Sequence, residues 1–193
     1  MPSVFTTRRN GASLAPYESL NLAQHVGDSA ETVARNRELL SKITGPIQFM
    51  NQVHGDEVVE VKSIGDDPTC DALITREPGI ALAVMVADCI PLLLSSSTVV
   101  GAVHVGRRGL MNSVAVKAVD AMRKLGADQI HAQLGPSICG RCYEVPQELA
   151  DEVVAKHPAA SSLTNNLTPA LDLPRALIAD LVASGVTYEA STI

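Results

Sequence analysis

Aromatic residues are scarce in this chain of 193 residues, which contains two Phe, three Tyr and no Trp. With so few aromatic side chains for bases to stack on, a platform for single-stranded nucleic acid is not expected. Positive charge is also in short supply, because 15 Lys and Arg are outnumbered by 21 Asp and Glu, which gives a net charge of −6. Such a chain repels a phosphate backbone, so nucleic acid is not an expected partner.

Long hydrophobic runs are missing as well. The longest apolar stretch, 80–87, is far shorter than the roughly 20 residues that cross a bilayer. Residues 1–9 lack the apolar segment of a secretory signal. We therefore expect a cytoplasmic protein that has no membrane partner.

The remaining composition is that of a globular domain, with 46% hydrophobic and 19% charged residues. The chain shows no internal repeat and no low-complexity tract, and its length suits a single unit. We therefore predict one domain over residues 1–193.

Hydrophobic periodicity predicts many strands and few helices. The predicted strands are 3–7, 47–53, 57–62, 72–75, 80–87, 91–94, 99–103 and 130–134, of which 80–87 is expected to be buried on both faces. The predicted helices run from about 31 to 44, where Ser29 is the expected cap, and over 110–125, 146–156 and 174–184. Because strands and helices do not alternate regularly, we predict an α+β fold with a large mixed sheet flanked by helices.

Three polar side chains interrupt the ends of predicted strands: His54, Cys89 and His104. Taken singly, each histidine is typical of a hydrogen-bonded loop residue and the cysteine of a buried packing residue. Taken together, they are the ligand types that zinc prefers, and neighbouring strand ends can converge on one ion. Three protein ligands would leave a fourth position for water, which is typical of a catalytic zinc site.

The chain also resembles a known family over nearly its whole length. The shared blocks, in family order, are Thr6-Thr7-Arg8, Pro16-Tyr17-Glu18-Ser19-Leu20-Asn21-Leu22, His25-Val26-Gly27-Asp28, Asn36-Arg37, Gln52-Val53-His54-Gly55, Asp71-Ala72-Leu73-Ile74-Thr75, Ala87-Asp88-Cys89-Ile90-Pro91, Gly135-Pro136-Ser137-Ile138 and Tyr143-Glu144-Val145. In these blocks the chain is similar to the YfiH-type purine nucleoside phosphorylases, which are also known as polyphenol oxidase or laccase-domain proteins.

The resemblance implies a function and a ligand set. It places zinc on His54, Cys89 and His104, and it implies phosphorolysis of adenosine, inosine and methylthioadenosine, together with adenosine deamination. The expected partners are therefore a nucleoside and inorganic phosphate. Two features depart from the family pattern: Arg107 stands where the family has an aromatic residue, and the family's aromatic, arginine-rich C-terminal tail is not found before Ile193.

Roles for further residues follow from their chemistry and position. Asp88 is a candidate for moving protons during deamination, and alternatively for orienting a zinc-bound histidine. Arg108 is the first candidate for holding phosphate and Arg8 the second, because a guanidinium matches phosphate in a bidentate way. Solvated surface charge is the alternative for both arginines. Gln52 and His25, which lie in family blocks, are predicted to bind substrate.

Two other kinds of function remain open. One Cys and two His also make a copper site, completed by a weak Met ligand such as Met85 or Met111, so a copper-dependent polyphenol oxidase is the alternative enzyme. A degenerate, non-catalytic member of the family is the other alternative.

The four cysteines are expected to be thiols. In a reducing compartment, a disulfide framework is not expected for the four cysteines, Cys70, Cys89, Cys139 and Cys142. The last two form a C-x-x-C motif without the thioredoxin-like βαβ context that a redox role normally has. We expect structural thiols near the pocket.

Overall fold

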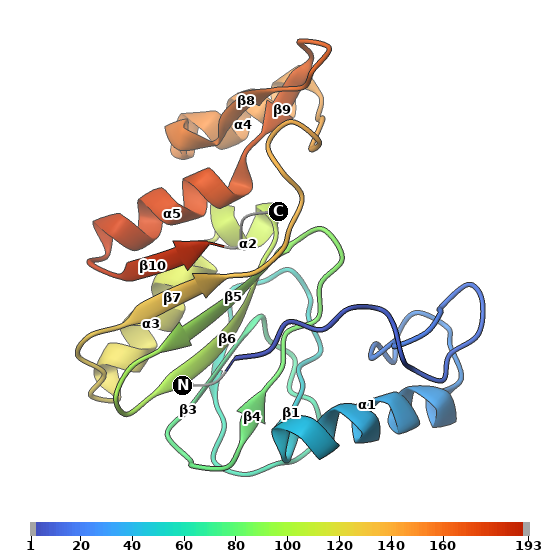
Figure 1. Cartoon of the computed structure of the whole chain (residues 1–193). Helices are drawn as coiled ribbons and strands as arrows, with labels where there is room; N and C mark the ends of the chain where they lie inside the picture. Colours follow the sequence, from blue (N-terminus) through green and yellow to red (C-terminus); the bar gives the residue numbers. More distant parts are fainter. Residues whose placement is uncertain (1–2, 191–193) are drawn as a thin grey trace.

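The computed structural model describes residues 3–190. A six-stranded mixed sheet forms its centre, with helices α3 (Val114–Lys124) and α5 (Leu173–Ala183) on one side (Figure 1). An N-terminal lobe, which consists of helix α1 (Ala30–Thr44) and the irregular segment before it, lies on the other side. The predicted α+β fold with a large mixed sheet is confirmed. Among the described residues, no helix combines the length and the apolar character that crossing a bilayer requires.

Among the described residues, α1 is the longest helix and the strands are short. The other helices are α1 (Ala30–Thr44), α2 (Arg107–Met111) and α4 (Gln147–Lys156), with a 3₁₀ turn, η1 (Pro158–Ala160). The strands are β1 (Ile47–Gln48), β2 (Val58–Glu60), β3 (Ala72–Thr75), β4 (Ala81–Leu82), β5 (Ile90–Ser95), β6 (Val100–Val105), β7 (His131–Leu134), β8 (Ser161–Leu163), β9 (Pro169–Leu171) and β10 (Thr187–Ala190).

The strand order of the main sheet is β10-β7-β5-β6-β3-β2. β5 lies at the middle, antiparallel to both β6 and β7, whereas the two outer pairs, β10 with β7 and β2 with β3, are parallel. Antiparallel pairing of β5 with β6 places the first residue of β5 beside the last residue of β6, with Ile90 opposite Val105. The polar residues that flank these two positions are therefore neighbours in space.

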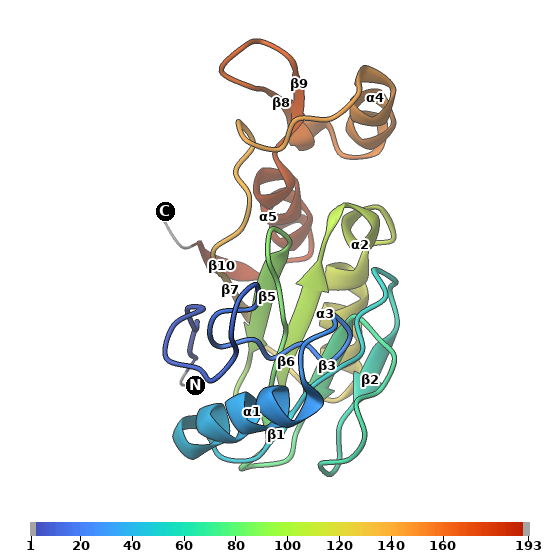
Figure 2. The same cartoon turned by 90° about the vertical axis from the view of Figure 1, so that its right-hand side faces the viewer.

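The sheet buries both of its faces. In β3, Ala72 and Ile74 belong to the large hydrophobic cluster beneath the helices, whereas Leu73 belongs to a second cluster with Met50 and Cys70 on the opposite face. This alternation follows from the two-residue period of a strand. The N-terminal lobe, with α1 in front in Figure 2, lies on the side of the sheet opposite α3.

Helix α1 organises the N-terminal lobe. Ser29 caps it, because its side chain accepts a hydrogen bond from the Thr32 N–H, and Gly45 ends it with a positive φ of 81°. On its buried side, the Asn36 side chain donates to Ser13 Oγ and to two main-chain carbonyls, and it accepts the N–H of Ala12. Asn36 therefore fastens the irregular segment that precedes the helix.

Several predicted elements differ from the structure. Residues 3–7 are not a strand, because their backbone pairs with none of the described strands. Phe5 lies instead against Gly135, where a Cβ would be 2.2 Å from its ring. The predicted strand 80–87 is reduced to β4, which pairs only with the short β1 and is half-buried. The predicted helix 110–125 is two helices, α2 and α3, because Ser113 between them has a left-handed φ of 61°.

Candidate metal centre

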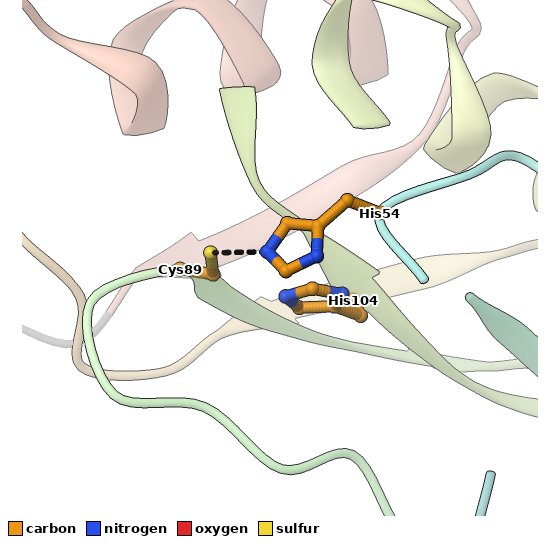
Figure 3. Close-up of side chains that lie close together, drawn as sticks. All are labelled: His54, Cys89 and His104. Carbon is orange, nitrogen blue, oxygen red and sulfur yellow. Dashed lines mark hydrogen bonds between the residues drawn. The ribbon is translucent and has the colours of Figure 1, made fainter. Parts of the chain in front are cut away.

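His54, Cys89 and His104 converge in the structure. Their ligand atoms all lie within 4.8 Å of one another, although they belong to three separate segments (Figure 3). His54 lies in the loop before β2, Cys89 immediately precedes β5, and His104 is the penultimate residue of β6. The pairing of β5 with β6 brings the last two together, whereas His54 joins them from a loop and not from the end of a strand.

The donor atoms point toward a common centre. Cys89 Sγ is 3.9 Å from His54 Nε2, and the rings of His54 and His104 meet edge to face with centroids 4.6 Å apart. Two ligands of a tetrahedral zinc are separated by about 3.5 Å when the zinc–sulfur and zinc–nitrogen bonds have their usual lengths. The three side chains therefore fit one ion of this size.

Asp71 holds two of the three candidate ligands. Its side chain is fully buried, and Oδ1 lies 2.7 Å from His104 Nδ1. The carboxylate also accepts the N–H groups of Val53, His54 and Gly55 at 3.2, 3.0 and 2.7 Å. These bonds curve the loop around one carboxylate and hold His54 at a positive φ of 57°. A non-glycine residue adopts such a conformation only when its surroundings enforce it.

The same contact selects the ligand atom of His104. Burial raises the pKa of the Asp71 carboxyl, but hydrogen bonds from His104, Gly55 and Val53 outweigh burial and bring that pKa below its usual value. An ionised Asp71 keeps the imidazole proton on Nδ1 of His104 and leaves Nε2 free to bind a metal. Burial lowers the pKa of His104 itself, so this ring is neutral, as a ligand must be.

Cys89 is a different kind of donor. Burial, followed by the negative charges of Asp88 and Asp71, raises the pKa of its thiol above the ordinary value. A cation at the centre would oppose both effects, because a coordinating thiol is deprotonated. The site therefore offers two imidazoles and one thiolate to a borderline or soft metal.

Gly106 leaves room for these donors. A Cβ atom on this residue would lie 2.9 Å from Cys89 Sγ and 3.2 Å from Cδ2 of His54. Gly106 lies between β6 and α2, so the main chain passes close to the cluster where the strand gives way to the helix. No larger residue fits here without moving a ligand.

The other predicted site residues lie in three places. Arg108 is exposed in α2, two residues after Gly106, and Asp88 is exposed next to Cys89, where its carbonyl accepts the N–H of Ile138. Arg8 is exposed in the N-terminal segment, where its Nε donates to the carbonyl of Glu18.

The remaining two predicted residues, His25 and Gln52, are associated with a pocket that Arg37 of α1 helps to line. Gln52 uses both ends of its side-chain amide on the main chain of Met85, at 2.7 and 2.8 Å. Met85 and His25 both line a pocket of about 610 Å³, together with Arg37 and Asp67. Gln52 therefore holds a wall of this pocket.

Asp71 is the residue that sequence reasoning did not assign. It opens a block shared with the family, yet no role followed from that position. The signal was a carboxylate between Cys70 and Ala72, which are both buried, because a charge in an apolar stretch requires partners.

The fold and the cluster define a mixed-sheet protein with a candidate mononuclear metal centre. A family model described as multi-copper polyphenol oxidoreductase laccase matches residues 2–193, and the chain belongs to this family. The resemblance to YfiH-type purine nucleoside phosphorylases inferred from the sequence is thereby confirmed.

Named relatives and solved structures support the same family assignment. A purine nucleoside phosphorylase of Streptomyces coelicolor is 48% identical, over 94% of this chain and 80% of that protein. Another, of Corynebacterium glutamicum, is 40% identical over 95% and 79%. The crystal structure of a Neisseria meningitidis protein superimposes with a TM-score of 0.88 at 34% identity, covering 97% and 80% of the two chains. Bacillus licheniformis YfiH, a hypothetical protein, gives 0.86 at 28%, covering 98% and 80%.

Proposed function

We propose that this chain is a zinc-dependent purine nucleoside phosphorylase that also deaminates adenosine. The observation that carries the proposal is the convergence of His54, Cys89 and His104 in a chain 48% identical to a relative named purine nucleoside phosphorylase. The proposed substrates are adenosine, inosine and methylthioadenosine.

The metal would be held by His54 Nε2, Cys89 Sγ and His104 Nε2, with Asp71 fixing the orientation of His104. When bound, zinc supplies a Lewis acid that activates water near neutral pH. His54 is the most exposed of the three residues, so the centre is open to solvent and substrate on that side. The neutral His104 and the buried Asp71 close the opposite side.

In phosphorolysis, an oxygen of inorganic phosphate bonds to C1′ of the ribose while the bond from C1′ to the purine nitrogen breaks. The electron pair leaves with the purine, which takes up a proton, and the products are the free base and ribose 1-phosphate. Arg108 is the proposed phosphate-binding residue and Arg8 the second candidate. His25 and Gln52 are proposed to contact or shape the nucleoside site.

In deamination, water adds at C6 of adenosine and ammonia leaves, which gives inosine. A proton must move from the water to the leaving nitrogen. The Asp88 carboxylate, next to Cys89 and exposed to solvent, is the proposed group for this transfer.

The test pairs metal analysis with turnover in the wild type and in His54→Ala. We expect close to one zinc per chain in the wild type, and loss of both zinc and turnover in the variant. Ribose 1-phosphate should form only when phosphate is supplied, whereas inosine should form from adenosine without it. A Cys89→Ala protein that keeps its full zinc content and full turnover would contradict the proposal.

A copper-dependent polyphenol oxidase is the second candidate, favoured by the description of the family model. One Cys and two His suit copper as well as zinc, with Met85 or Met111 as a weak further ligand. Copper in the purified protein, an intense visible absorption band and oxidation of a phenol without nucleoside turnover would favour this candidate.

A further inference from the structure

Cys139 and Cys142 lie outside the candidate metal centre, in the turn that follows β7. Their Sγ atoms are 3.1 Å apart and both residues are exposed. The N–H of Cys142 donates to the carbonyl of Cys139 at 3.0 Å, which closes a tight turn. A turn of this kind keeps its end Cα atoms within about 7 Å, close to the range that a disulfide spans.

Neighbouring elements hold this turn in place. Ile138 donates its N–H to the Asp88 carbonyl at 2.9 Å, and the Tyr143 carbonyl accepts the N–H of Leu171 at 3.1 Å. Between them, Gly140 lies so close to Asp172 that a Cβ would approach that side chain to 2.6 Å. Because the turn is fixed on both sides, the two thiols stay side by side.

The surroundings also make the two sulfurs unequal. The hydrogen bond between the two thiols and one from the Arg141 N–H lower the pKa of Cys139, and the contact with Cys139 raises the pKa of Cys142. Burial, in contrast, raises the pKa of Cys70 to about 11. Cys139 therefore holds more thiolate at neutral pH than Cys70 does, and reactivity follows the thiolate.

We propose that Cys139 and Cys142 are a redox-active pair that closes into a reversible intramolecular disulfide. With hydrogen peroxide as oxidant, the Cys139 thiolate attacks one oxygen, the O–O bond breaks, and a sulfenic acid and water form. The Cys142 sulfur then attacks Cys139, the S–S bond forms, and the S–O bond breaks to release a second water. A small thiol such as dithiothreitol reverses the change and becomes a disulfide itself.

The position of the pair has a further consequence. The turn is bonded through Ile138 to Asp88, the residue before the candidate ligand Cys89. Cys139 is exposed, whereas Cys89 is partly buried. Oxidant is therefore expected to reach the pair before it reaches the candidate metal ligand.

The experiment is residue-resolved thiol analysis of the full chain. The reduced protein is treated with limiting hydrogen peroxide, alkylated, digested and examined by mass spectrometry. We expect loss of two hydrogen atoms from the protein mass and a peptide linkage between Cys139 and Cys142, both reversed by dithiothreitol. Without oxidant, Cys139 should be alkylated roughly tenfold or more faster than Cys70.

Two variants make the result specific. In Cys142→Ser, the disulfide should be lost and Cys139 should instead accumulate as sulfenic acid, trapped by a sulfenic-acid reagent. In Cys89→Ser, the disulfide should form as in the wild type. A disulfide that joins Cys89 to either cysteine, or complete alkylation of both thiols after oxidant treatment, would overturn the proposal.

Discussion

Asp71 accepts hydrogen bonds from His104 and from the N–H groups of Val53, His54 and Gly55, so its replacement affects two ligands at once. We predict that Asp71→Asn weakens zinc binding by about 10–100-fold, the usual effect of removing such a partner. Competition with a chromophoric chelator measures the affinity. The matched control is Asp120→Asn, whose carboxylate is 57% exposed and whose loss should leave zinc binding unchanged. Equal affinity in the wild type and Asp71→Asn would refute the positioning role.

Gly106 offers a second test at the same scale. We predict that Gly106→Ala lowers zinc affinity by about tenfold or more and the thermal midpoint as well, because overpacking forces neighbours out of place. The new methyl group would press on Cys89 Sγ at 2.9 Å. Gly65→Ala is the control, because a Cβ at that position meets nothing within 4 Å. Differential scanning fluorimetry with and without zinc compares the two, and matching curves would show that the close approach does not matter.

The metal-free protein should lose stability as the pH falls. Burial lowers the pKa of His104 below its ordinary value of 6.5, and hydrogen bonds lower the pKa of Asp71 below its ordinary value of 3.8. Because the unfolded chain then binds more protons than the folded one, the stability contribution of His104 is complete above 6.5 and is lost as the pH falls below it; that of Asp71 follows below 3.8. Urea unfolding from roughly pH 7.5 to 5 should show this decrease. His104→Gln should flatten it, and an unchanged slope would contradict the assignment.

At the scale of elements, α1 and the segment before it depend on one buried amide. Asn36→Ala removes the hydrogen bonds to Ser13, Ser19, Asn21 and Ala12. Buried polar groups left without partners cost about 1–3 kcal/mol each, and we predict a loss of about 3 kcal/mol in the free energy of unfolding. Limited proteolysis should also cut within residues 11–21. Arg35→Ala, an exposed neighbour on α1, should behave as the wild type in both measurements.

The sequence predicted correctly those elements whose signal lies within their own residues. The strand at 72–75 and the cap at Ser29 were predicted correctly, because a buried run and a cap residue are local signals. The prediction of a long buried strand over 80–87 was wrong, because the backbone there has only the short β1 to pair with. β10 was missed because its four residues are all exposed and carry no alternation.

The same division applies to the candidate site. His54, Cys89 and His104 were predictable because their ligand chemistry follows or ends predicted strands in the sequence, although His54 lies in a loop in the structure. The role of Asp71 depends on how the loop that contains His54 wraps around it, and only the folded chain shows this.

At the scale of the whole molecule, β5 joins the two halves of the main sheet, since it pairs with both β6 and β7. Leu92 at its centre is fully buried. We predict that Leu92→Ala lowers the free energy of unfolding by about 2–5 kcal/mol through the cavity it leaves. Leu163→Ala, at a position 52% exposed, should change it by less than about 0.5 kcal/mol. Urea titration followed by circular dichroism compares them, and similar midpoints would argue against β5 as the structural centre.

The three candidate ligands come from segments far apart in the chain, and this has a thermodynamic consequence. A cation that binds all of them acts as a removable cross-link, because the unfolded chain cannot present the same arrangement. By mass action, such an ion adds about 2.7 kcal/mol to stability when its free concentration is a hundred times the dissociation constant. The supply of metal would then set the lifetime of the folded molecule, and a chelator would shorten it.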